Sequence, residues 1–456
     1  MGRLIELISE NPALKFIDAE TETEFTLSEI LQNKISEKLQ VPRTVAFLYL
    51  DNSFASVATL LNFLNSRHVA VLLNTKLNEK LKSNLEQVYT PSFIYDPERS
   101  AIEGYLNSDS NLFYKSTTIP NLHPELKLML STSGTTGSPK FVKLSENNLV
   151  ENALSIIDYL PITVTDSTPL NLPVYYSYGL SVLTSNSIAG GKIICSNKDI
   201  LQKEFWQEME KFGYTSLSGV PYMYEMLNRL GFTKKQYPTL RYLTQAGGKL
   251  NEKLINIFSE YSTKNAIEFY VMYGQTEATA RMSYLAPTLL NSKKGSIGKP
   301  IKNGQFSIVS ETEELVYEGP NVFGGYAEKP EDLSTFEANE KLHTGDIAEM
   351  DTDGYYYIKG RLKRIAKIFG NRVNLDEIEQ LLKNNFLQNQ FACAGLNDQF
   401  LLMGITGSDK NENEIRQFIS DTLKIHPTVI KTAFISELPL TANGKPDYAK
   451  LAELFS

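Results

Sequence analysis

The sequence predicts an α/β protein built from three successive parts: an α/β body, a small β module and a compact α+β tail. Two observations support this organisation. Short apolar runs alternate with helix-length stretches through the first two thirds of the chain, which is typical of parallel strands with both faces buried. Near residue 300 this alternation gives way to closely spaced strand signals, which favour antiparallel pairing.

The body contains apolar runs that we interpret as strands, separated by stretches with helical periodicity. The predicted strands are, in order, 44–50, 68–73, 92–95, 126–130, 192–195, 240–244 and 267–273. Helices are expected at 54–65 and 78–88 between the first three strands. Pro221 suits a first helical position and Asn251 suits a helix N-cap, so both are expected to begin helices.

The β module and the tail follow. Strands of the module are predicted at 305–309, 313–318, 347–350 and 355–359, the last two around the turn Asp353-Gly354. In the tail, which begins at residue 363, helices are expected at 375–382 and 412–423, and a hairpin around Asn397-Asp398.

Composition excludes several classes of protein. The chain has 456 residues, of which 42% are hydrophobic and 21% are charged, ordinary values for a folded protein and not for a disordered chain or a coiled coil. Its 45 Lys and Arg residues against 53 Asp and Glu residues leave a net charge of −8. That balance argues against a globally basic nucleic-acid binder, and we expect no nucleic-acid partner.

Further expectations concern the cysteines, the histidines and the N-terminus. Cys195 and Cys393 stand far apart in apolar surroundings and are interpreted as reduced, buried thiols. The four histidines are scattered, which argues against a zinc site. No uncharged apolar run reaches the roughly 18 residues of a membrane helix, and Glu6 interrupts the start where a signal peptide is apolar. We therefore expect a cytoplasmic protein without membrane contact.

A loop rich in glycine and hydroxyl residues is the sharpest local signal. It runs from Ser131 to Lys140 between two apolar strands. Small residues allow backbone N–H groups to approach an anion, hydroxyl groups add donors, and a lysine supplies positive charge. A Walker A loop is excluded because Pro139 and Phe141 replace a required Gly and a required Ser or Thr. A flexible glycine–serine turn is the alternative interpretation.

This loop resembles the phosphate loop of the adenylate-forming superfamily, which includes acyl- and aryl-CoA synthetases, luciferase and the adenylation domains of peptide synthetases. The resemblance covers about residues 26–450. It implies a large N-terminal domain of stacked α/β subdomains with a small β module, at 1–362, and a small mobile C-terminal lid, at 363–456. It also implies that ATP is contacted by the loop residues Ser131, Thr132, Ser133, Gly134, Thr135, Thr136 and Gly137, with Lys140 in a catalytic role.

The motif Tyr273-Gly274-Gln275-Thr276-Glu277 follows a predicted strand. By resemblance, Tyr273 stacks on adenine, Gly274 belongs to the nucleotide site, Thr276 hydrogen-bonds the α-phosphate and Glu277 holds Mg²⁺. A carboxylate beside a phosphate site does need a divalent cation between them. The segment that contains Gly247 and Gly248 resembles the turn that contacts adenine.

Other motifs resemble the ribose site and the hinge. Asp346, in His343-Thr344-Gly345-Asp346, resembles the residue that accepts both ribose hydroxyls, a task that suits a carboxylate. Arg361 resembles a second ribose contact, and Lys363 stands at the hinge position.

The tail carries the remaining motifs. Lys367 and Arg372 belong to a stretch that is similar to a nucleotide-contacting segment of the family, and Gly370 lies on a loop that serves the thiol-transfer step. Lys445 resembles the terminal lysine that bridges the carboxylate and the α-phosphate, where a cation offsets charge developing in the transition state. Leu440 and Pro446 depart from the usual residues beside this motif.

The segment 172–180 resembles the acyl-site motif, with Tyr176 at the usual aromatic position. Tyr176, Ser177 and Gly298 are expected to line the acyl pocket, and Gly274 and Gly298 to leave room for the acyl group. Amino-acid-activating relatives carry Asp where Ser177 stands. A buried ammonium would lack a counter-charge here, so an α-amino acid is disfavoured. The tyrosines fit an aromatic, short or hydroxylated acid, or an ordinary pocket wall.

These motifs predict an AMP-forming acid–thiol ligase. A small carboxylic acid and ATP, with Mg²⁺, would form an acyl-adenylate and pyrophosphate, and a thiol would then take the acyl group. The thiol is that of CoA or the phosphopantetheine of an acyl carrier protein, and nothing in the sequence separates these acceptors. Transfer to a non-thiol acceptor and a non-catalytic adenylate-binding relative are the alternatives.

Overall fold

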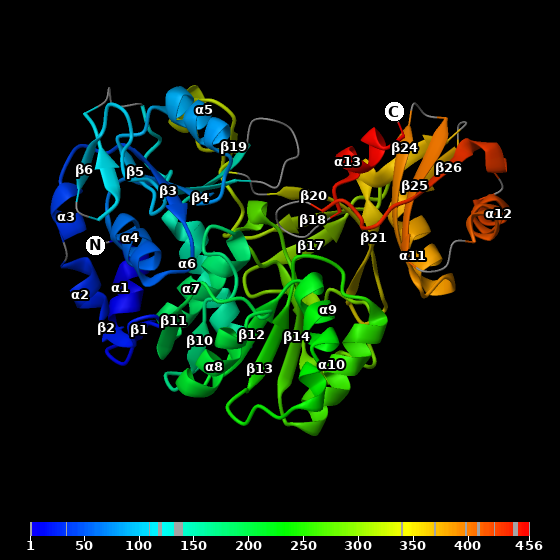
Figure 1. The fold of residues 1–456 in the computed structure, drawn as a ribbon, viewed down its shortest axis with the longest axis horizontal. Helices are drawn as coiled ribbons and strands as arrows, with labels where there is room; N and C mark the ends of the chain where they lie inside the picture. The colour runs from blue at the N-terminus through cyan, green and yellow to red at the C-terminus, as the bar shows by residue number, and fades with distance from the viewer. Residues whose placement is uncertain are drawn as a thin grey trace. The chain divides into compact units, whose positions relative to one another are not determined.

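The computed structural model describes residues 2–32, 34–108, 110–116, 121–131, 140–338, 341–368, 371–396, 399–407, 411–423, 425–440 and 446–455. These residues form two compact units (Figure 1). The first contains the described residues up to 305 together with Tyr317–Leu342. The second contains Phe306–Val316 and the described residues from His343 onward. The predicted domain division at residue 363 stays a prediction.

An eight-stranded sheet occupies the N-terminal part of the first unit, in the order β19-β9-β8-β4-β3-β5-β7-β6. In chain order its strands are β3 (Val45–Leu50), β4 (Val69–Asn74), β5 (Phe93–Tyr95), β6 (Leu106–Ser108), β7 (Leu112–Tyr114), β8 (Leu128–Ser131), β9 (Phe141–Leu144) and β19 (Tyr326–Ala327). β3 pairs in parallel with β4 and β5, and β4 with β8. Every residue of β3 is buried, as an apolar strand covered on both faces must be.

Helices connect the central strands of this sheet as the alternating pattern predicts. They are α4 (Phe54–Asn65) and α5 (Glu79–Tyr89). Ser53 caps α4 by accepting a hydrogen bond from the backbone N–H of Ser56, and Asn78 caps α5 in a similar way. The shorter helices α1 (Arg3–Ser9), α2 (Leu27–Leu31) and α3 (Lys34–Lys38) precede β3.

A five-stranded sheet carries three parallel strands, β12 (Ser216–Gly219), β13 (Tyr242–Gln245) and β14 (Glu268–Tyr273). Two antiparallel strands, β15 (Ser283–Leu285) and β16 (Lys299–Pro300), extend it. Figure 1 shows α9 (Pro221–Arg229) and α10 (Glu252–Lys264) beside these strands. Pro221 begins α9 and Asn251 caps α10, as predicted. The carboxyl ends of β12, β13 and β14 share one edge, where open α/β sheets bind ligands.

The third sheet of the first unit joins distant parts of the chain in the order β10-β11-β1-β2. Its strands are β1 (Lys15–Asp18), β2 (Thr23–Phe25), β10 (Ser167–Pro169) and β11 (Lys192–Cys195). The remaining helices of the unit are α6 (Glu146–Tyr159), α7 (Ser177–Ala189), α8 (Lys203–Phe212), η1 (Phe232–Lys234), η2 (Thr276–Ala278), η3 (Pro287–Leu289) and η4 (Pro330–Ser334).

The predicted β module and tail follow, and most of their residues belong to the second unit. The module is the sheet β17-β18-β20-β21, formed by β17 (Gln305–Ile308), β18 (Glu314–Glu318), β20 (Leu342–Met350) and β21 (Tyr356–Arg361). The tail contains η5 (Leu362–Arg364), β22 (Ile365–Ile368), β23 (Asn371–Asn374), α11 (Leu375–Asn385), β24 (Asn389–Leu396), β25 (Phe400–Gly407), α12 (Glu412–Leu423), η6 (Pro427–Val429), β26 (Ile430–Phe434) and α13 (Tyr448–Glu453). The predicted hairpin is confirmed by the antiparallel pairing of β24 and β25, although its turn lies outside the described residues.

Two expectations about the whole chain can be compared with the fold. Cys195 and Cys393 are free and buried, as predicted, and burial raises the pKa of both thiols. Within the described part of the chain, none of the helices has the length and apolar character needed to cross a membrane.

Candidate active site

Two antiparallel strands bracket the predicted phosphate loop. β8 ends at Ser131 and β9 begins at Phe141, and these two residues are paired. Residues 132–139 lie outside the described residues, so the nucleotide contacts expected of Thr132, Ser133, Gly134, Thr135, Thr136 and Gly137 stay predictions. The pairing of the flanking strands does hold the two ends of this segment next to each other.

Lys140 and Glu277 are 137 positions apart in the chain, and both contact Tyr326. The Tyr326 hydroxyl donates a hydrogen bond to Glu277 Oε1 at 2.9 Å. Lys140 Nζ lies 3.8 Å from the centre of the Tyr326 ring and 3.3 Å from Glu328 Oε1. The pairing of β19 with β9 places Tyr326 opposite Val142, two residues beyond Lys140. The first unit therefore brings a predicted phosphate-binding lysine and a predicted metal ligand to one tyrosine.

The protonation of Tyr326 supports this contact. Burial is the first cause that raises the pKa of the phenol, and the nearby Glu277 carboxylate raises it further. The phenol therefore stays protonated at neutral pH and can only donate to Glu277. The backbone carbonyl of Glu277 is also engaged, because it accepts a hydrogen bond from Phe323 N–H at 2.9 Å.

A tight turn carries Thr276 and Glu277 away from the end of β14. A Cβ on Gly274 would lie 1.7 Å from the carbonyl oxygen of Ala280, so only glycine fits there. Thr279 and Ala280 adopt φ values of 61° and 150°, which are unfavourable for residues with a side chain. Asn321 holds the turn, because its Nδ2 donates to the carbonyl oxygens of Ala278 and Arg281, each at 2.8 Å.

The predicted adenine turn and the predicted acyl motif come together at the same sheet edge. A Cβ on Gly247, whose φ is 82°, would lie 3.0 Å from the Tyr176 hydroxyl. Gln245 Nε2 donates to the carbonyl oxygen of Gly248 at 2.8 Å, which stabilises this turn. Ser177, the first residue of α7, lies with its Oγ 3.3 Å from Thr276 Oγ1. The segments predicted to contact the nucleotide and the segment predicted to contact the acid therefore lie next to each other.

Gly298 has a structural reason to be glycine. Its φ is 84°, and a Cβ would lie 1.8 Å from the carbonyl oxygen of Tyr284. As at Gly274, the absent side chain allows a close approach of backbone to backbone. The expected role of these glycines in leaving room for the acyl group stays a prediction.

The second unit brings Asp346 and Arg361 together. They are paired residues of β20 and β21, and Arg361 Nε donates to Asp346 Oδ1 at 3.1 Å. The Asp346 side chain is 8% exposed, whereas that of Arg361 is 62% exposed. The turn before Asp346 is fixed by Glu314, which accepts a hydrogen bond from the Gly345 N–H at 3.0 Å. The two predicted ribose contacts thus lie side by side.

Lys363, the predicted hinge, lies within η5 and is followed by a firmly anchored residue. Arg364 Nε donates to Asp376 Oδ1 at 2.8 Å, and its guanidinium also pairs with Glu379 at 2.5 Å. The backbone carbonyl of Cys393 accepts a third hydrogen bond from Arg364, at 2.6 Å. The chain immediately after Lys363 is therefore tied to α11 and β24.

The remaining predicted tail residues are described only in part. Lys367 and Arg372 are paired across β22 and β23, and nothing is described of their side chains. Gly370 and Lys445 lie outside the described residues, and a bridge between Leu440 and Pro446 flanks the segment that contains Lys445. The roles expected of these four residues stay predictions.

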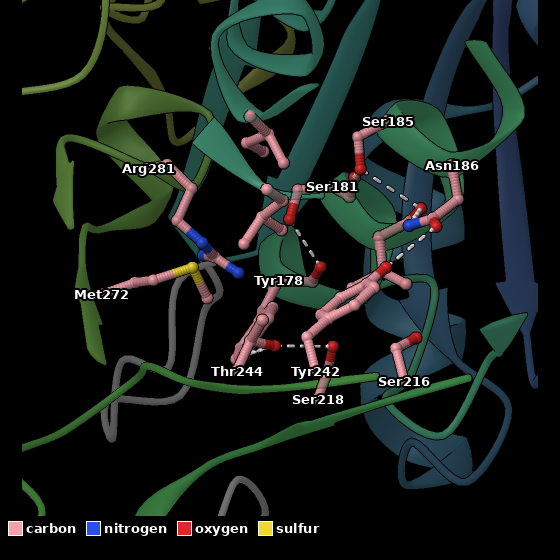
Figure 2. A pocket seen from close by; sticks show the side chains of 13 residues that line it. Tyr178, Ser181, Ser185, Asn186, Ser216, Ser218, Tyr242, Thr244, Met272 and Arg281 are labelled. Atoms are coloured by element: carbon pink, nitrogen blue, oxygen red, sulfur yellow. Dashed lines mark hydrogen bonds between the residues drawn. The ribbon is translucent and has the colours of Figure 1, made fainter. Parts of the chain in front are cut away.

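Sequence reasoning missed three residues that shape the site. Tyr326, whose hydroxyl contacts Glu277, belongs to no recognisable motif. Asn321 donates hydrogen bonds to backbone carbonyl groups of a turn that lies far from it in the sequence. Arg281 did leave a signal, since it is the one charged residue between Glu277 and Lys293 in the sequence. Its side chain is almost fully buried and lines a small, largely polar cavity (Figure 2).

The chain is similar in sequence to known enzymes. The family model described as "AMP-binding enzyme" matches residues 43–327. The chain is 27% identical over 399 residues to oxalate–CoA ligase of Arabidopsis thaliana, covering 83% of this chain and 76% of that protein. It is 28% identical over 401 residues to 2-succinylbenzoate–CoA ligase of Bacillus cereus, covering 83% of this chain and 81% of that protein.

A solved structure shows the same fold. The O-succinylbenzoate Coenzyme A synthetase from Bacillus subtilis, in complex with ATP and a magnesium ion, matches with a TM-score of 0.78 at 20% identity, over 98% of each chain. This likeness confirms the predicted α/β fold with a large N-terminal region. Because the family model matches more than half of the sequence, the chain belongs to the family of AMP-binding enzymes, the adenylate-forming group that its motifs resemble.

Proposed function

We propose that this AMP-binding enzyme is an acid–thiol ligase that converts a small carboxylic acid into its CoA thioester. In the first half-reaction a carboxylate oxygen would bond to the α-phosphorus of ATP, and the bond from that phosphorus to pyrophosphate would break. In the second, the CoA sulfur, having lost its proton, would bond to the acyl carbon, and AMP would leave. The observation that carries the proposal is the contact of Lys140 and Glu277 with Tyr326, close to the turn that carries Thr276.

The described residues fit Mg²⁺ held mainly by a nucleotide. No group of three or more His, Cys, Asp or Glu side chains able to hold a metal occurs among them. Glu277 supplies one carboxylate, which is the usual protein contribution where substrate phosphates and water complete the coordination. When bound, Mg²⁺ would supply positive charge that offsets the phosphates. The Tyr326 hydroxyl, by donating to Oε1, orients the Glu277 carboxylate for that task.

Several side chains and one turn of this protein would contribute to adenylation. Lys140 would contact the phosphates and Thr276 would donate its hydroxyl to the α-phosphate. The turn at Gly247 and Gly248, together with Tyr273, would hold the adenine ring. The Asp346 carboxylate, with Arg361 beside it, would accept the ribose hydroxyls. Lys445 would bring a cation to the reacting carboxylate and phosphorus.

The acceptor is proposed to be CoA. Two curated relatives are named as CoA ligases, and each covers 83% of this chain. Transfer to the phosphopantetheine of a carrier protein or to a non-thiol acceptor would be recognised by the products. The absence of an acidic residue in 172–181 supports the expectation that α-amino acids are not activated.

Pyrophosphate exchange measured across a panel of carboxylic acids tests the proposal. We expect exchange that depends on the acid and on Mg²⁺, and formation of AMP rather than ADP. Addition of CoA should then yield an acyl-CoA of the expected mass. If no acid supports exchange, or if ADP and phosphate are the products, the proposal is wrong. If exchange occurs but CoA yields no thioester, the acceptor is another group.

Glu277→Gln is expected to raise the Mg²⁺ concentration needed for half-maximal exchange about tenfold, because the site loses its anionic ligand. The measurement is a Mg²⁺ titration of the exchange rate at saturating ATP and acid. Glu318→Gln is the matched control, because Glu318 lies in the same unit and pairs with Lys341 at the surface. The control should titrate like the wild type. An unchanged titration for Glu277→Gln would remove this residue from the metal site.

A further inference from the structure

A three-residue turn, 343–345, leads directly into Asp346, the predicted ribose contact, and every residue of the turn is hydrogen-bonded to strand β18. The Thr344 hydroxyl donates to the carbonyl oxygen of Leu315 at 2.6 Å and accepts a hydrogen bond from the Asp346 N–H at 3.1 Å. The other two residues of the turn contact a single side chain of the same strand. Because β18 and β20 are adjacent in the sheet, these contacts tie the turn to its neighbouring strand.

That side chain is Glu314, which uses both oxygens of its carboxylate on the turn. Oε1 accepts a hydrogen bond from the Gly345 N–H at 3.0 Å, and Oε2 accepts one from Nδ1 of His343 at 2.8 Å. The Glu314 side chain is 13% exposed. Glu349, in the same sheet, is 55% exposed and pairs with Lys359. A surface ion pair of that kind contributes little to stability, whereas Glu314 also holds the main chain.

Gly345 is the residue of the turn that most needs this restraint. Its φ is 72°, in the left-handed region, and a Cβ there would meet no atom within 4 Å. Backbone conformation rather than lack of space therefore requires glycine. Glycine also samples more backbone conformations than any other residue, so a fixed conformation depends on contacts from outside the turn. The hydrogen bond from the Gly345 N–H to Glu314 is such a contact.

The strand is irregular on the other side of Asp346. Asp346 is paired with β21, but the register of the two strands shifts between Ile347 and Ala348. A flexible glycine therefore precedes the carboxylate and an irregular pairing follows it, so the regular ladder of the sheet does not by itself place Asp346. The position of this carboxylate then depends on the contacts that hold the turn, and Glu314 makes two of them.

We propose that Glu314 is a positioning residue on which the enzyme's preference for a ribonucleotide depends. By holding the turn at Gly345, Glu314 directs the Asp346 carboxylate toward the two ribose hydroxyls. Placement matters because a hydrogen bond weakens steeply as its angle departs from linearity. The inference rests on the proposed function and on the proposed ribose contact of Asp346. Since Glu314 acts through Asp346, its loss should impair the use of ATP and spare a nucleotide that lacks both hydroxyls.

ATP and 2′,3′-dideoxyATP, which lacks both ribose hydroxyls, test the inference in the pyrophosphate exchange assay. For the wild type we expect kcat/KM to favour ATP by about a hundredfold, because hydrogen bonds to a charged acceptor are strong. Glu314→Met keeps the length of the side chain but removes both acceptors, and it should lower this preference about tenfold through ATP alone. Glu314→Asp keeps the charge but is one methylene shorter, so it should behave in the same way, and it replaces Glu314→Met if that variant does not fold.

The conservative variant Glu314→Gln should restore most of the preference. Its amide oxygen can accept the hydrogen bond of the Gly345 N–H, and its amide N–H can donate to the other tautomer of His343. Glu349→Met is the matched control, because it removes a carboxylate of the same sheet that forms a surface ion pair. This control should keep the wild-type preference.

A double variant distinguishes positioning from a general loss of stability. If Glu314 acts through Asp346, adding Glu314→Met to Asp346→Ala should change the preference for ATP no further. A further loss of preference in the double variant would show that Glu314 acts elsewhere, and the inference would be wrong. Thermal unfolding of each variant shows whether it is folded at the assay temperature.

The remaining outcomes separate the inference from the proposed function. If the wild type uses 2′,3′-dideoxyATP as well as ATP, the proposed function stands, but Asp346 does not select the ribose and the Glu314 inference is wrong. If a folded Glu314→Met or Glu314→Asp variant keeps the preference, or loses rate with both nucleotides equally, Glu314 does not position the ribose contact. If no carboxylic acid supports exchange with ATP, the proposed function itself fails.

Discussion

Replacing Lys445 by alanine is expected to lower the rate of pyrophosphate exchange about a thousandfold, the size of effect seen when one preorganised charge-stabilising group is removed. Negative charge accumulates when a carboxylate approaches an already anionic phosphate, and the proposed lysine offsets it only in that step. The affinity for ATP should change little, because an interaction made mainly in the transition state contributes to kcat rather than to ground-state binding. Exchange kinetics give the rate and ATP titrations give the affinity for ATP, both measured on the same samples.

The second half-reaction gives the matched test of Lys445. The variant supplied with a preformed acyl-adenylate should still transfer the acyl group to CoA at close to the wild-type rate. Lys450→Ala, which removes an exposed lysine at the end of the same tail, should retain exchange. An exchange rate near that of wild type in Lys445→Ala would show that another group supplies the charge.

Proline at position 363 is expected to lower thioester formation roughly a hundredfold while pyrophosphate exchange persists, since small errors in placement cost about that much. One site would have to serve two reactions, so we propose that the tail changes its orientation by rotation about Lys363. Proline fixes φ near −65° and also restricts the residue before it. Since Arg364 is anchored to α11 and β24, the change in backbone angles would have to occur at or before Lys363.

Lys363→Ala separates the charge of this residue from its backbone freedom. It should keep both half-reactions, because alanine leaves φ unrestricted. The two rates are measured separately, as pyrophosphate exchange without CoA and as AMP release with CoA. Equal loss of both in a folded Lys363→Pro variant would mean that residue 363 is not a hinge.

Much of the fold was predictable because its central strands are apolar throughout. β3 and β4 are buried along nearly their whole length, and the helix between them, α4, carries a recognisable cap. The N-terminal strands were not predicted. β1 has four residues and pairs with β11, so Lys15 lies opposite Lys192, a partner far along the chain that no local pattern reveals.

The site was predictable where several chemical groups lie close together in the sequence. Thr276 and Glu277 stand in one motif, and the register of β20 and β21 then joined Asp346 to Arg361. Tyr326 could not be found in this way, because its hydroxyl meets Glu277 49 positions away and only the pairing of β19 with β9 places it there. Arg281 was visible as an isolated charge, but its burial against the Tyr178 ring is a property of the folded chain.

The burial of Cys195 and Cys393 has a practical consequence for studying this enzyme. They are the two cysteines of the sequence, both are buried, and burial raises both pKa values, so little reactive thiolate is present at neutral pH. A colorimetric disulfide reagent added to the native protein should therefore titrate the free thiol of CoA with almost no background from the polypeptide. Consumption of CoA could be followed directly in aliquots of a working reaction, and a slow rise in signal without CoA would report unfolding.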